Sequence, residues 1–497
     1  MKKIGFDNEK YVQLQSKCIR ERIATFGGKL YLEFGGKLFD DYHASRVLPG
    51  FKADSKLQML LQLKEDAEIV IAINAADIEK NKVRGDLGIT YDLDVLRLID
   101  AFRSVGLFVG SVVLTRYTGQ KSADVFENKL RALGVKVYHH YPIEGYPYDV
   151  QRIVSEEGYG RNDYIETTHR LVIITAPGPG SGKMATCLSQ LYHENKRGIK
   201  AGYAKFETFP IWNLPLKHPV NLAYEAATAD LNDVNMIDPY HLEAYGVSTV
   251  NYNRDVEIFP VLEATFREIY GESPYKSPTD MGVNMAGKCI VDDEACCEAS
   301  RQEIIRRYYN AACDQRENMD SSAAAAVAKI ELLMKNLGLS TDDRPVVPAA
   351  ESRAEETGAP AAALELPDGT IVTGKTSPLL GAVAAMMLNA LKKLARIDDD
   401  MDIIAPSIIE PVQHLKVDHL GNHNPRLHSD EVLIALAISA VTSPAAAKAL
   451  KQLDKLAGCE AHSSVILSQN DNRTLKKLNI NITCTPQYQV KKLYHAK

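Results

Sequence analysis

The sequence lacks a long apolar run, which makes a membrane partner improbable from the outset. Its two longest charge-free stretches are Thr376–Leu391 and Val432–Ala447. Both are shorter than the ~20 apolar residues that cross a bilayer, and both contain proline. The chain starts with basic residues but shows no apolar stretch of the kind that a secretory signal requires. We therefore expect no membrane partner.

Dense cysteine spacing and a large net charge are also missing. The eight cysteines form no CxxC pair within 497 residues, so a disulfide scaffold is excluded and reduced thiols in the cytoplasm are expected. The formal charge of -6 argues against a protein dedicated to nucleic acid or to an anionic membrane surface. We expect a cytoplasmic protein without a nucleic-acid partner.

What is present is the composition of a folded multidomain protein, with 45% hydrophobic and 25% charged residues. Short apolar runs alternate with amphipathic segments such as Asp92–Val105 and Ser122–Leu133. This alternation predicts an α/β fold with a parallel sheet. The expected strands are Leu30–Phe34, Glu68–Asn74, Val109–Thr115, Val135–His139 and Leu171–Thr175.

Changes of composition along the chain predict its organisation. Residues 1–235 read as an α/β phosphate-binding domain with a Rossmann-like or P-loop-like strand, loop and helix, and residues 236–340 as a mainly helical region. Residues 341–367, rich in Ala, Pro and Glu, suit an extended connector. Residues 368–497 return to a smaller α/β domain with helices at Pro378–Ala395 and Asp430–Val441.

The strongest signal for chemistry is a glycine-rich loop between a buried strand and a helix. Strand Leu171–Thr175 runs into Ala-Pro-Gly-Pro-Gly-Ser-Gly-Lys-Met-Ala-Thr. In this context, backbone N–H groups and the N-terminus of a helix surround a phosphate, and a lysine reaches its outer oxygens. The predicted binding residues are Gly178, Gly180, Ser181, Gly182, Lys183 and Thr186, with Lys183 also able to stabilise phosphoryl charge.

The loop departs from the Walker pattern GxxxxGK[ST] in two places. Pro177 stands where the first glycine belongs, and Met184 stands where a hydroxyl would hold Mg²⁺. Anion binding, with ATP or another nucleotide as one ligand, is therefore favoured over Mg²⁺-dependent hydrolysis. The alternative is a glycine-rich turn that caps a helix.

A literal match to the Walker pattern occurs at Gly369–Thr376, but its β-branched interior predicts a strand, so we interpret it as a chance match. Asp238 ends an apolar run and is a candidate for the acidic partner of a phosphate loop. A structural turn before Pro239 would explain it equally well.

Polar residues follow the first expected strand, where parallel sheets bind ligands. Lys37, Asp40, His43 and Arg46 follow Leu30–Phe34, and we name Asp40, His43 and Arg46 as candidate catalytic residues. A structural ion pair between the arginine and a carboxylate would explain the same residues.

Histidines gather near the C-terminus, within a segment whose Gly, Asn and Pro residues predict a loop. Imidazoles and carboxylates are ligands for zinc and other divalent ions, but the spacing matches no established motif. The segment is a metal site, a functional loop or a solvated polar loop. The candidate ligands are His414, His419, His423 and His428.

Three long segments together resemble a bacterial family known as domain of unknown function 1846. They are Tyr31–Phe51, Thr175–Gln190 and Leu415–Ser439, and the similarity extends nearly from end to end. The resemblance implies a multidomain α/β cytoplasmic protein with a segment like a phosphate loop. It implies no activity and no catalytic residue.

These signals favour an enzyme that binds a nucleotide or another small phosphorylated ligand at Gly178–Lys183. A non-catalytic nucleotide sensor or assembly protein is the first alternative, because Pro177 and Met184 remove features that hydrolysis usually needs. A metal-dependent hydrolase built on His414–His428 is the second. The Ala-rich helices are compatible with a homo-oligomer, although the sequence identifies no interface.

Overall fold

The computed structural model describes residues 3–36, 38–39, 41–84, 87–318 and 321–489. The chain divides into two compact units. The first, here the N-terminal unit, holds residues 4–225 and 233–299. The second, the C-terminal unit, holds residues 1–3, 226–232 and 300–497. Among the described residues, no helix has the length and apolarity needed to span a bilayer.

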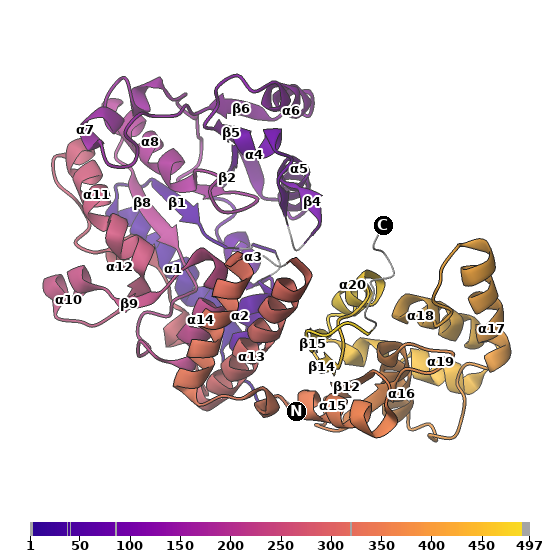
Figure 1. Cartoon of the computed structure of the whole chain (residues 1–497). Coiled ribbons are helices and arrows are strands. Elements are labelled where there is room, and N and C mark those ends of the chain that lie inside the picture. The colour runs from indigo at the N-terminus through magenta and orange to yellow at the C-terminus, as the bar shows by residue number, and fades with distance from the viewer. Residues whose placement is uncertain (1–2, 37, 40, 85–86, 319–320, 490–497) are drawn as a thin grey trace. The chain divides into compact units, whose positions relative to one another are not determined.

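The N-terminal unit is built on a seven-stranded parallel sheet with the order β11-β8-β1-β7-β2-β5-β6 (Figure 1). Apolar runs at five of these positions predict the strands to within one residue at each end. The parallel α/β fold predicted from the sequence is confirmed. The strands are β1 (Leu30–Phe34), β2 (Ala67–Asn74), β5 (Phe108–Thr115), β6 (Lys136–His139), β7 (Leu171–Thr175), β8 (Gly202–Phe206) and β11 (Gly282–Val283).

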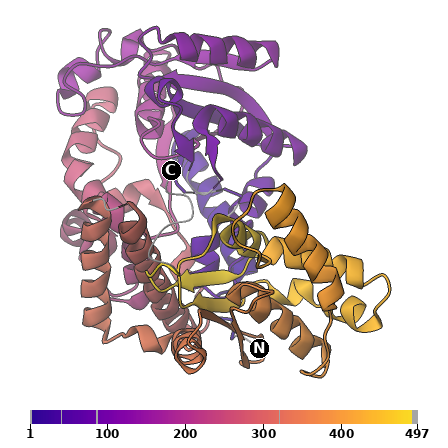
Figure 2. The ribbon, with the colours of Figure 1, turned by 45° about the vertical axis from the view of Figure 1, so that its right-hand side comes forward.

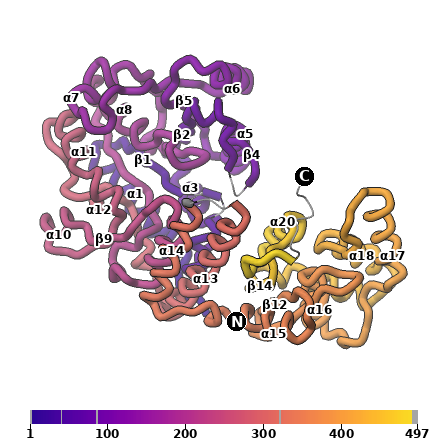
Figure 3. The backbone as a smooth tube through the Cα atoms, in the orientation of Figure 1, coloured from indigo at the N-terminus to yellow at the C-terminus, as the bar shows by residue number. Residues whose placement is uncertain are grey.

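The chain leaves two neighbouring strands of this sheet in opposite directions. From β2 it continues to β5, and from β7 it continues across β1 to β8; Figure 3 lets the reader follow β1, β2 and β5. Right-handed crossovers then put α5 (Tyr91–Ser104) and α6 (Lys121–Ala132) on one face and α8 (Lys183–Lys196) on the other. Where connections diverge in this way, the carboxyl ends of the strands leave a place for a ligand.

Helices α8 and α11 cover one face of the sheet, where apolar residues of β1, β2, β7 and β8 pack against Leu188, Leu191, Phe259 and Phe266. The helices of this unit are α1 (Asn8–Thr25), α2 (Tyr42–Val47), α3 (Ser55–Leu61), α4 (Ala75–Glu79), α5 (Tyr91–Ser104), α6 (Lys121–Ala132), α7 (Val150–Ile153), α8 (Lys183–Lys196), α9 (Pro219–Ala227), α10 (Pro239–Tyr245), α11 (Asn253–Tyr270) and α12 (Pro278–Met281). Two short antiparallel pairs, β3 (Val83–Arg84) with β4 (Ile89–Thr90) and β9 (Asn235–Ile237) with β10 (Val250–Tyr252), complete it.

The region predicted to be mainly helical begins in this unit and supplies parts of its sheet. Residues 236–299 contribute the covering helix α11 and the edge strand β11. The division between the units falls within α13 (Asp293–Asn318), which is followed by α14 (Ser321–Leu337).

The C-terminal unit contains a four-stranded mixed sheet with the order β13-β12-β14-β15, of which β14 and β15 are the yellow strands in Figure 2. Its strands are β12 (Ala361–Glu365), β13 (Ile371–Lys375), β14 (Glu460–Ser463) and β15 (Asn481–Cys484). Its core joins the sheet to α16 and α18. The helices after α14 are α15 (Val346–Thr357), α16 (Ala382–Ala395), α17 (Pro406–His414), α18 (Ser429–Ser439), α19 (Pro444–Leu450) and α20 (Gln469–Lys477).

The segment 341–367 is not the extended connector that its composition suggests, because it contains α15 and β12. Three of its prolines flank these elements and the fourth lies in a first helical turn: Pro345 caps α15, Pro348 is the third residue of α15, Pro360 precedes β12 and Pro367 follows it. Between them, the Ala- and Glu-rich composition favours a helix. The prolines therefore start elements here instead of keeping the chain extended.

A fully buried arginine holds the C-terminal sheet together. The Arg344 guanidinium donates to the Glu460 carboxylate at 2.7 Å and to the carbonyls of Ala461 and Asn481 at 3.1 and 2.9 Å. Its Nε donates to the Thr483 hydroxyl at 3.2 Å. The planar fork of an arginine suits such a set of acceptors, and burial of the charge is offset by these bonds.

Candidate functional site

The glycine-rich loop lies at the carboxyl end of β7, near the middle of the sheet, and leads directly into α8. Gly180 and Gly182 have φ angles of 76° and 86°, a region that residues with a Cβ rarely adopt. Gly182 is the residue before the first helical position, which Lys183 occupies. The predicted order of strand, glycine loop and helix N-terminus is therefore present.

Neighbouring side chains hold the loop in place. The Thr115 hydroxyl, at the end of β5, donates to the Ser181 carbonyl at 2.8 Å, and the Ser181 hydroxyl donates to the Gly178 carbonyl at 2.9 Å. The Tyr91 ring fills the space beside Gly178, where a Cβ would lie 2.1 Å from the tyrosine hydroxyl. The loop is thus fixed without a ligand.

The N-terminus of α8 offers donors that the protein does not use. Across the described ranges, no residue accepts a hydrogen bond from the backbone N–H of Gly182, Lys183 or Met184. Within the same ranges the Lys183 ammonium has no ion-pair or hydrogen-bond partner, and its side chain is half-buried. Unused amides at the positive end of a helix dipole, beside an unpaired ammonium, form a binding place for an anion.

Two hydroxyls that the sequence offered for ligand contact are turned to the backbone instead. The buried Thr186 hydroxyl donates to the Gly182 carbonyl at 3.0 Å, within its own helix. The Ser181 hydroxyl is used inside the loop, as described above. Met184, at the position where a Walker motif has a hydroxyl, packs against the apolar core under α8. The loop therefore presents amides and an ammonium, with no side-chain hydroxyl directed to a magnesium ion.

A charged cluster that the sequence reasoning missed lies at the carboxyl end of strand β8. The Lys205 ammonium lies 2.9 Å from a Glu207 carboxylate oxygen and pairs closely with Asp255 in the first turn of α11. Glu207 is buried, and Lys205 and Asp255 are about one-quarter exposed. A sequence signal exists, because Lys205 and Glu207 interrupt an otherwise apolar parallel strand as it ends.

The environment of this cluster shifts the ionisation of its members. Burial, followed by the negative charge of Asp255, raises the pKa of Glu207 to about 7, although Lys205 opposes the shift. Burial lowers the pKa of Lys205, but the carboxylates of Asp255 and Glu207 outweigh it and raise that pKa above its ordinary value. A carboxyl group that titrates near neutrality at the ligand-binding edge of a sheet is a candidate acid or base.

Glu33 links the loop to this cluster. It lies on β1 in register with Lys205, and its carboxylate accepts a hydrogen bond from the Tyr203 hydroxyl at 2.7 Å. After burial, the charge of Glu33 raises the pKa of the Cys187 thiol on α8, while the charge of Lys183 lowers it. Lys183 and Glu33 thus act on the same buried thiol from the ends of neighbouring elements.

The polar residues after β1 are partly placed by the structure. His43 lies in the short helix α2, and its ring packs edge-on against Phe209 and Tyr224 at 5.2 and 5.4 Å between centroids. Arg46 lies in the last turn of α2 and is half-buried. Lys37 and Asp40 lie outside the described residues. The neighbouring Asp41 pairs with Lys56 at 2.7 Å and caps α2.

Asp238 is not the acidic partner of the phosphate loop. Its strand, β9, pairs with β10 and is not part of the seven-stranded sheet. The buried carboxylate caps α10 by accepting from the His241 N–H at 3.0 Å, and it accepts the Thr279 hydroxyl at 2.6 Å. Asp238 is therefore a structural group, in agreement with the alternative that the sequence offered, a turn before Pro239.

The literal Walker match in the C-terminal half forms a strand, as its β-branched residues predict. Ile371–Lys375 is β13. Gly374 lies so close to α16 that a Cβ would stand 2.0 Å from the Met386 backbone nitrogen. Close packing of strand on helix, not a phosphate, accounts for this glycine.

The four C-terminal histidines do not gather around one point. His414, His419 and His423 are exposed, and His414 pairs with Asp418 at 2.9 Å. His428 is half-buried and pairs with Asp471 at 2.9 Å, a contact that raises the pKa of the imidazole. In the part of the chain that the structure describes, none of the four belongs to a group of three metal-ligating side chains.

The His428–Asp471 pair instead joins two helix N-termini. His428 precedes α18, and Asp471 lies in the first turn of α20, where it also accepts from the backbone N–H and the hydroxyl of Ser429. Although burial opposes it, contact with His428 lowers the pKa of Asp471 to about 2. These contacts explain the pair as a structural link between α18 and α20.

The fold and its polar edge define a multidomain α/β protein whose N-terminal half is a parallel sheet with charged side chains after its strands. Comparison with known families is consistent with this class. The chain belongs to the family described as "Domain of unknown function DUF1846": the N-terminal model matches residues 4–338 and the C-terminal model residues 342–494. The family resemblance found in the sequence is confirmed.

Bacterial relatives match the chain over almost its whole length. The chain is 60% identical over 494 residues to a UPF0371 protein of Streptococcus pneumoniae serotype 19F (strain G54), which covers 99% of this chain and 100% of the relative. A UPF0371 protein of Streptococcus thermophilus (strain ATCC BAA-491 / LMD-9) matches with the same identity and coverage. The names of these relatives state no activity.

Proposed function

We propose that this protein is a cytoplasmic enzyme that binds a small phosphorylated ligand, a nucleotide such as ATP or a sugar phosphate, at the loop before α8. One observation carries the proposal: unused N–H groups at the start of α8 and the unpaired Lys183 ammonium meet at a glycine loop after a central parallel strand. A phosphate supplies the several acceptors and the negative charge that these donors lack.

The reacting part of the ligand would lie toward β8. Strands β7 and β8 are separated by β1 alone, and neighbouring strands are ~4.8 Å apart, so their ends are about 10 Å apart. That separation suits a ligand with a phosphate at one end and a sugar or base at the other. Glu207, with its pKa near 7, would exchange a proton with the ligand, and Lys205 would stabilise negative charge.

Magnesium is not required for this mode of binding. Thr186 and Ser181 use their hydroxyls within the loop, and Met184 has none to offer. We therefore propose that ligand affinity depends on Lys183 and changes little when Mg²⁺ is removed.

A thermal-shift panel of nucleotides and sugar phosphates, with and without Mg²⁺, tests the binding. A ligand that binds only the folded state adds about 2.7 kcal/mol of stability at a hundredfold excess over its dissociation constant. Lys183→Ala should abolish the shift. Lys196→Ala is the matched control, because Lys196 lies at the other end of α8, is half-exposed and pairs with Glu156 at the surface.

The two variants distinguish specific binding of the ligand at the loop from a general effect of removing one positive charge. Loss of the shift in Lys183→Ala and its retention in Lys196→Ala supports a phosphate in the loop. Equal shifts in both variants and the wild type would reject the loop as the binding place. Absence of any shift across the panel would reduce the loop to a helix cap.

A non-catalytic nucleotide sensor is the second candidate, and the hydroxyl geometry of the loop favours it. With Ser181 and Thr186 bonded to the backbone, the loop holds no side-chain hydroxyl for the metal that assists hydrolysis in Walker-type sites. Ligand that is bound but recovered unchanged, with Glu207→Gln binding as tightly as wild type, would select the sensor. We propose neither nucleic acid nor a membrane as a partner, and formation of a homo-oligomer stays a prediction.

A further inference from the structure

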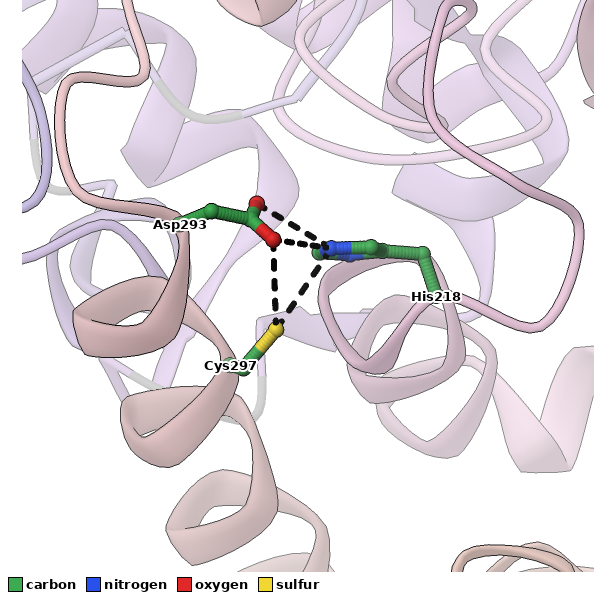
Figure 4. Close-up of side chains that lie close together, drawn as sticks. All are labelled: His218, Asp293 and Cys297. Atoms are coloured by element: carbon green, nitrogen blue, oxygen red, sulfur yellow. Dashed lines mark hydrogen bonds and ion pairs between the residues drawn. The ribbon is translucent and has the colours of Figure 1, made fainter.

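Three side chains of different chemistry converge in the N-terminal unit, apart from the sheet edge described above. His218 precedes α9, while Asp293 and Cys297 lie one turn apart at the start of α13 (Figure 4). The spacing of four residues places the carboxylate and the thiol on the same face of the helix. His218 and Cys297 are buried, and the Asp293 side chain is 61% exposed.

The distances among the three ligand atoms are those of one face of a tetrahedron. His218 Nε2 lies 3.3 Å from Asp293 Oδ2 and 3.5 Å from Cys297 Sγ, and Cys297 Sγ lies 3.9 Å from the same Asp293 Oδ2. Zinc bonds of about 2.0–2.3 Å to nitrogen, oxygen and sulfur place tetrahedral ligands about 3.3–3.6 Å apart. An ion at the centre would therefore need only small side-chain movements.

A catalytic triad explains the same residues less well. In a nucleophile–histidine–acid triad, the nucleophile and the acid contact opposite nitrogens of the imidazole. Here the thiol and the carboxylate both approach Nε2, while Nδ1 accepts from the Val220 N–H at 3.3 Å. Convergence on one nitrogen is a feature of shared coordination, not of proton relay.

The Val220 contact is a small obstacle to metal binding. If Nε2 binds a metal, the ring proton must move to Nδ1, and the hydrogen bond from Val220 is lost. One such hydrogen bond contributes far less to stability than coordination of zinc by cysteine and histidine does. The metal contacts therefore outweigh the lost bond.

We propose that His218, Asp293 and Cys297 form a site for a zinc-type divalent ion, with the fourth position open to water or to a ligand atom. The mixture of nitrogen, oxygen and sulfur donors selects Zn²⁺ or Co²⁺ over Mg²⁺ and Ca²⁺, which prefer oxygen ligands alone. The exposed Asp293 leaves the ion accessible from solvent, as in zinc sites that keep three protein ligands.

Metal titration of the full chain tests this site. The chelator-treated, reduced protein is dialysed against micromolar Zn²⁺, and bound zinc is counted by elemental analysis. Titration with Co²⁺ then reports the ligands, because a thiolate-to-cobalt charge-transfer band requires a bound cysteine. We expect one tightly bound Zn²⁺ per chain and this band on Co²⁺ binding.

Matched variants assign the ligands. Cys297→Ser and His218→Gln should weaken Zn²⁺ binding at least a hundredfold, and Cys297→Ser should remove the charge-transfer band. Asp293→Asn, an isosteric change at an exposed position, should weaken binding about tenfold. Cys289→Ser is the control, because Cys289 is a neighbouring buried thiol that bonds to the Met285 carbonyl.

The outcomes are distinct from those of the phosphate experiment. Absence of stoichiometric zinc, or equal binding by Cys297→Ser and wild type, would overturn the site whatever the loop before α8 binds. Far-ultraviolet circular dichroism without metal shows whether each variant folds. If a buried variant does not fold, Asp293→Asn decides: unchanged zinc affinity would count against the proposal.

Discussion

The sheet of the C-terminal unit and the sheet edge of the N-terminal unit differ in how completely their charged residues are paired. In the C-terminal unit, each buried or half-buried charge that we described completes a set of bonds: Arg344 joins β14 to β15 through Ala461 and Asn481, and His428 joins two helices through Asp471. At the sheet edge of the N-terminal unit, Lys183 has no partner among the described residues, and the pKa of Glu207 is raised. The difference teaches that a charge serves stability where its bonds are complete, and that chemistry is best sought where they are not.

Loss of Arg344 is the largest effect that we predict. Arg344→Met removes the donor to two backbone carbonyls and one of the two arginines that pair with the Glu460 carboxylate, and should lower the free energy of unfolding of the C-terminal unit by about 3–5 kcal/mol. Urea unfolding measures the loss, and Arg353→Met, at a partly exposed arginine that pairs with Glu356 within its own helix, is the control. If Arg344→Met also abolished phosphate binding, the contrast between the units would fail.

A pair of glycine substitutions sharpens the comparison within the loop. Gly182→Ala combines a left-handed backbone, which costs about 1–2 kcal/mol, with a Cβ only 3.1 Å from the Thr115 side chain. Gly180→Ala has the same backbone penalty, but no atom lies within 4 Å of its Cβ. Thermal unfolding should therefore show a greater loss for Gly182→Ala. Equal losses would mean that the loop moves to relieve the contact.

The His428–Asp471 pair should give the C-terminal unit a bell-shaped dependence of stability on pH. The pKa of His428 is raised, so its contribution is complete below ~6.5 and is lost as pH rises through the raised value. The pKa of Asp471 is lowered to about 2, so its contribution is complete above ~4 and is lost as pH falls toward 2. His428→Ala should cost about 1–2 kcal/mol at pH 5 and flatten the alkaline side of the curve. A curve unchanged by the substitution would show that the pair contributes nothing.

The smallest effect is spectroscopic. Because the pKa of Glu207 is about 7, the infrared band of a protonated carboxyl group should disappear as pH rises through neutrality. Glu207→Gln should remove this transition, and Asp255→Asn should move it to lower pH, because Asp255 is the charge that raises the pKa. A transition that persists in Glu207→Gln would belong to another group and would break the contrast between the units.

The sequence predicts most of the sheet and part of the site, for reasons that are local. Apolar runs such as Leu171–Thr175 become buried strands because a parallel sheet is covered by helices on both faces, which removes the apolar side chains from water. The glycines after this strand permit the turn into α8. The same local reasoning identifies β13 correctly, since β-branched residues cannot form a flexible loop. Composition gives the wrong prediction at 341–367, where the prolines flank α15 and β12 or lie in the first turn of α15.

The remaining parts of the site depend on distant segments. Lys205 and Asp255 are 50 residues apart in the chain, and His218 and Asp293 are 75 apart. Neither pair has a spacing that a motif could reveal, because the tertiary fold alone brings them together. Thr186 shows the opposite error: its sequence position suggested a ligand contact, but a helical threonine can bond to its own backbone, and this one does.

The clamped loop before α8 also sets how fast a ligand can bind. Thr115 and Tyr91 already hold the loop in the conformation that exposes its N–H groups, so no segment has to become ordered during association. The observed association rate should then rise linearly with ligand concentration and show no plateau from a slow opening step. Thr115→Val removes the hydroxyl but keeps the shape of the side chain. In this variant we expect the observed association rate to reach a plateau at high ligand concentration, because the loop must first adopt the binding conformation.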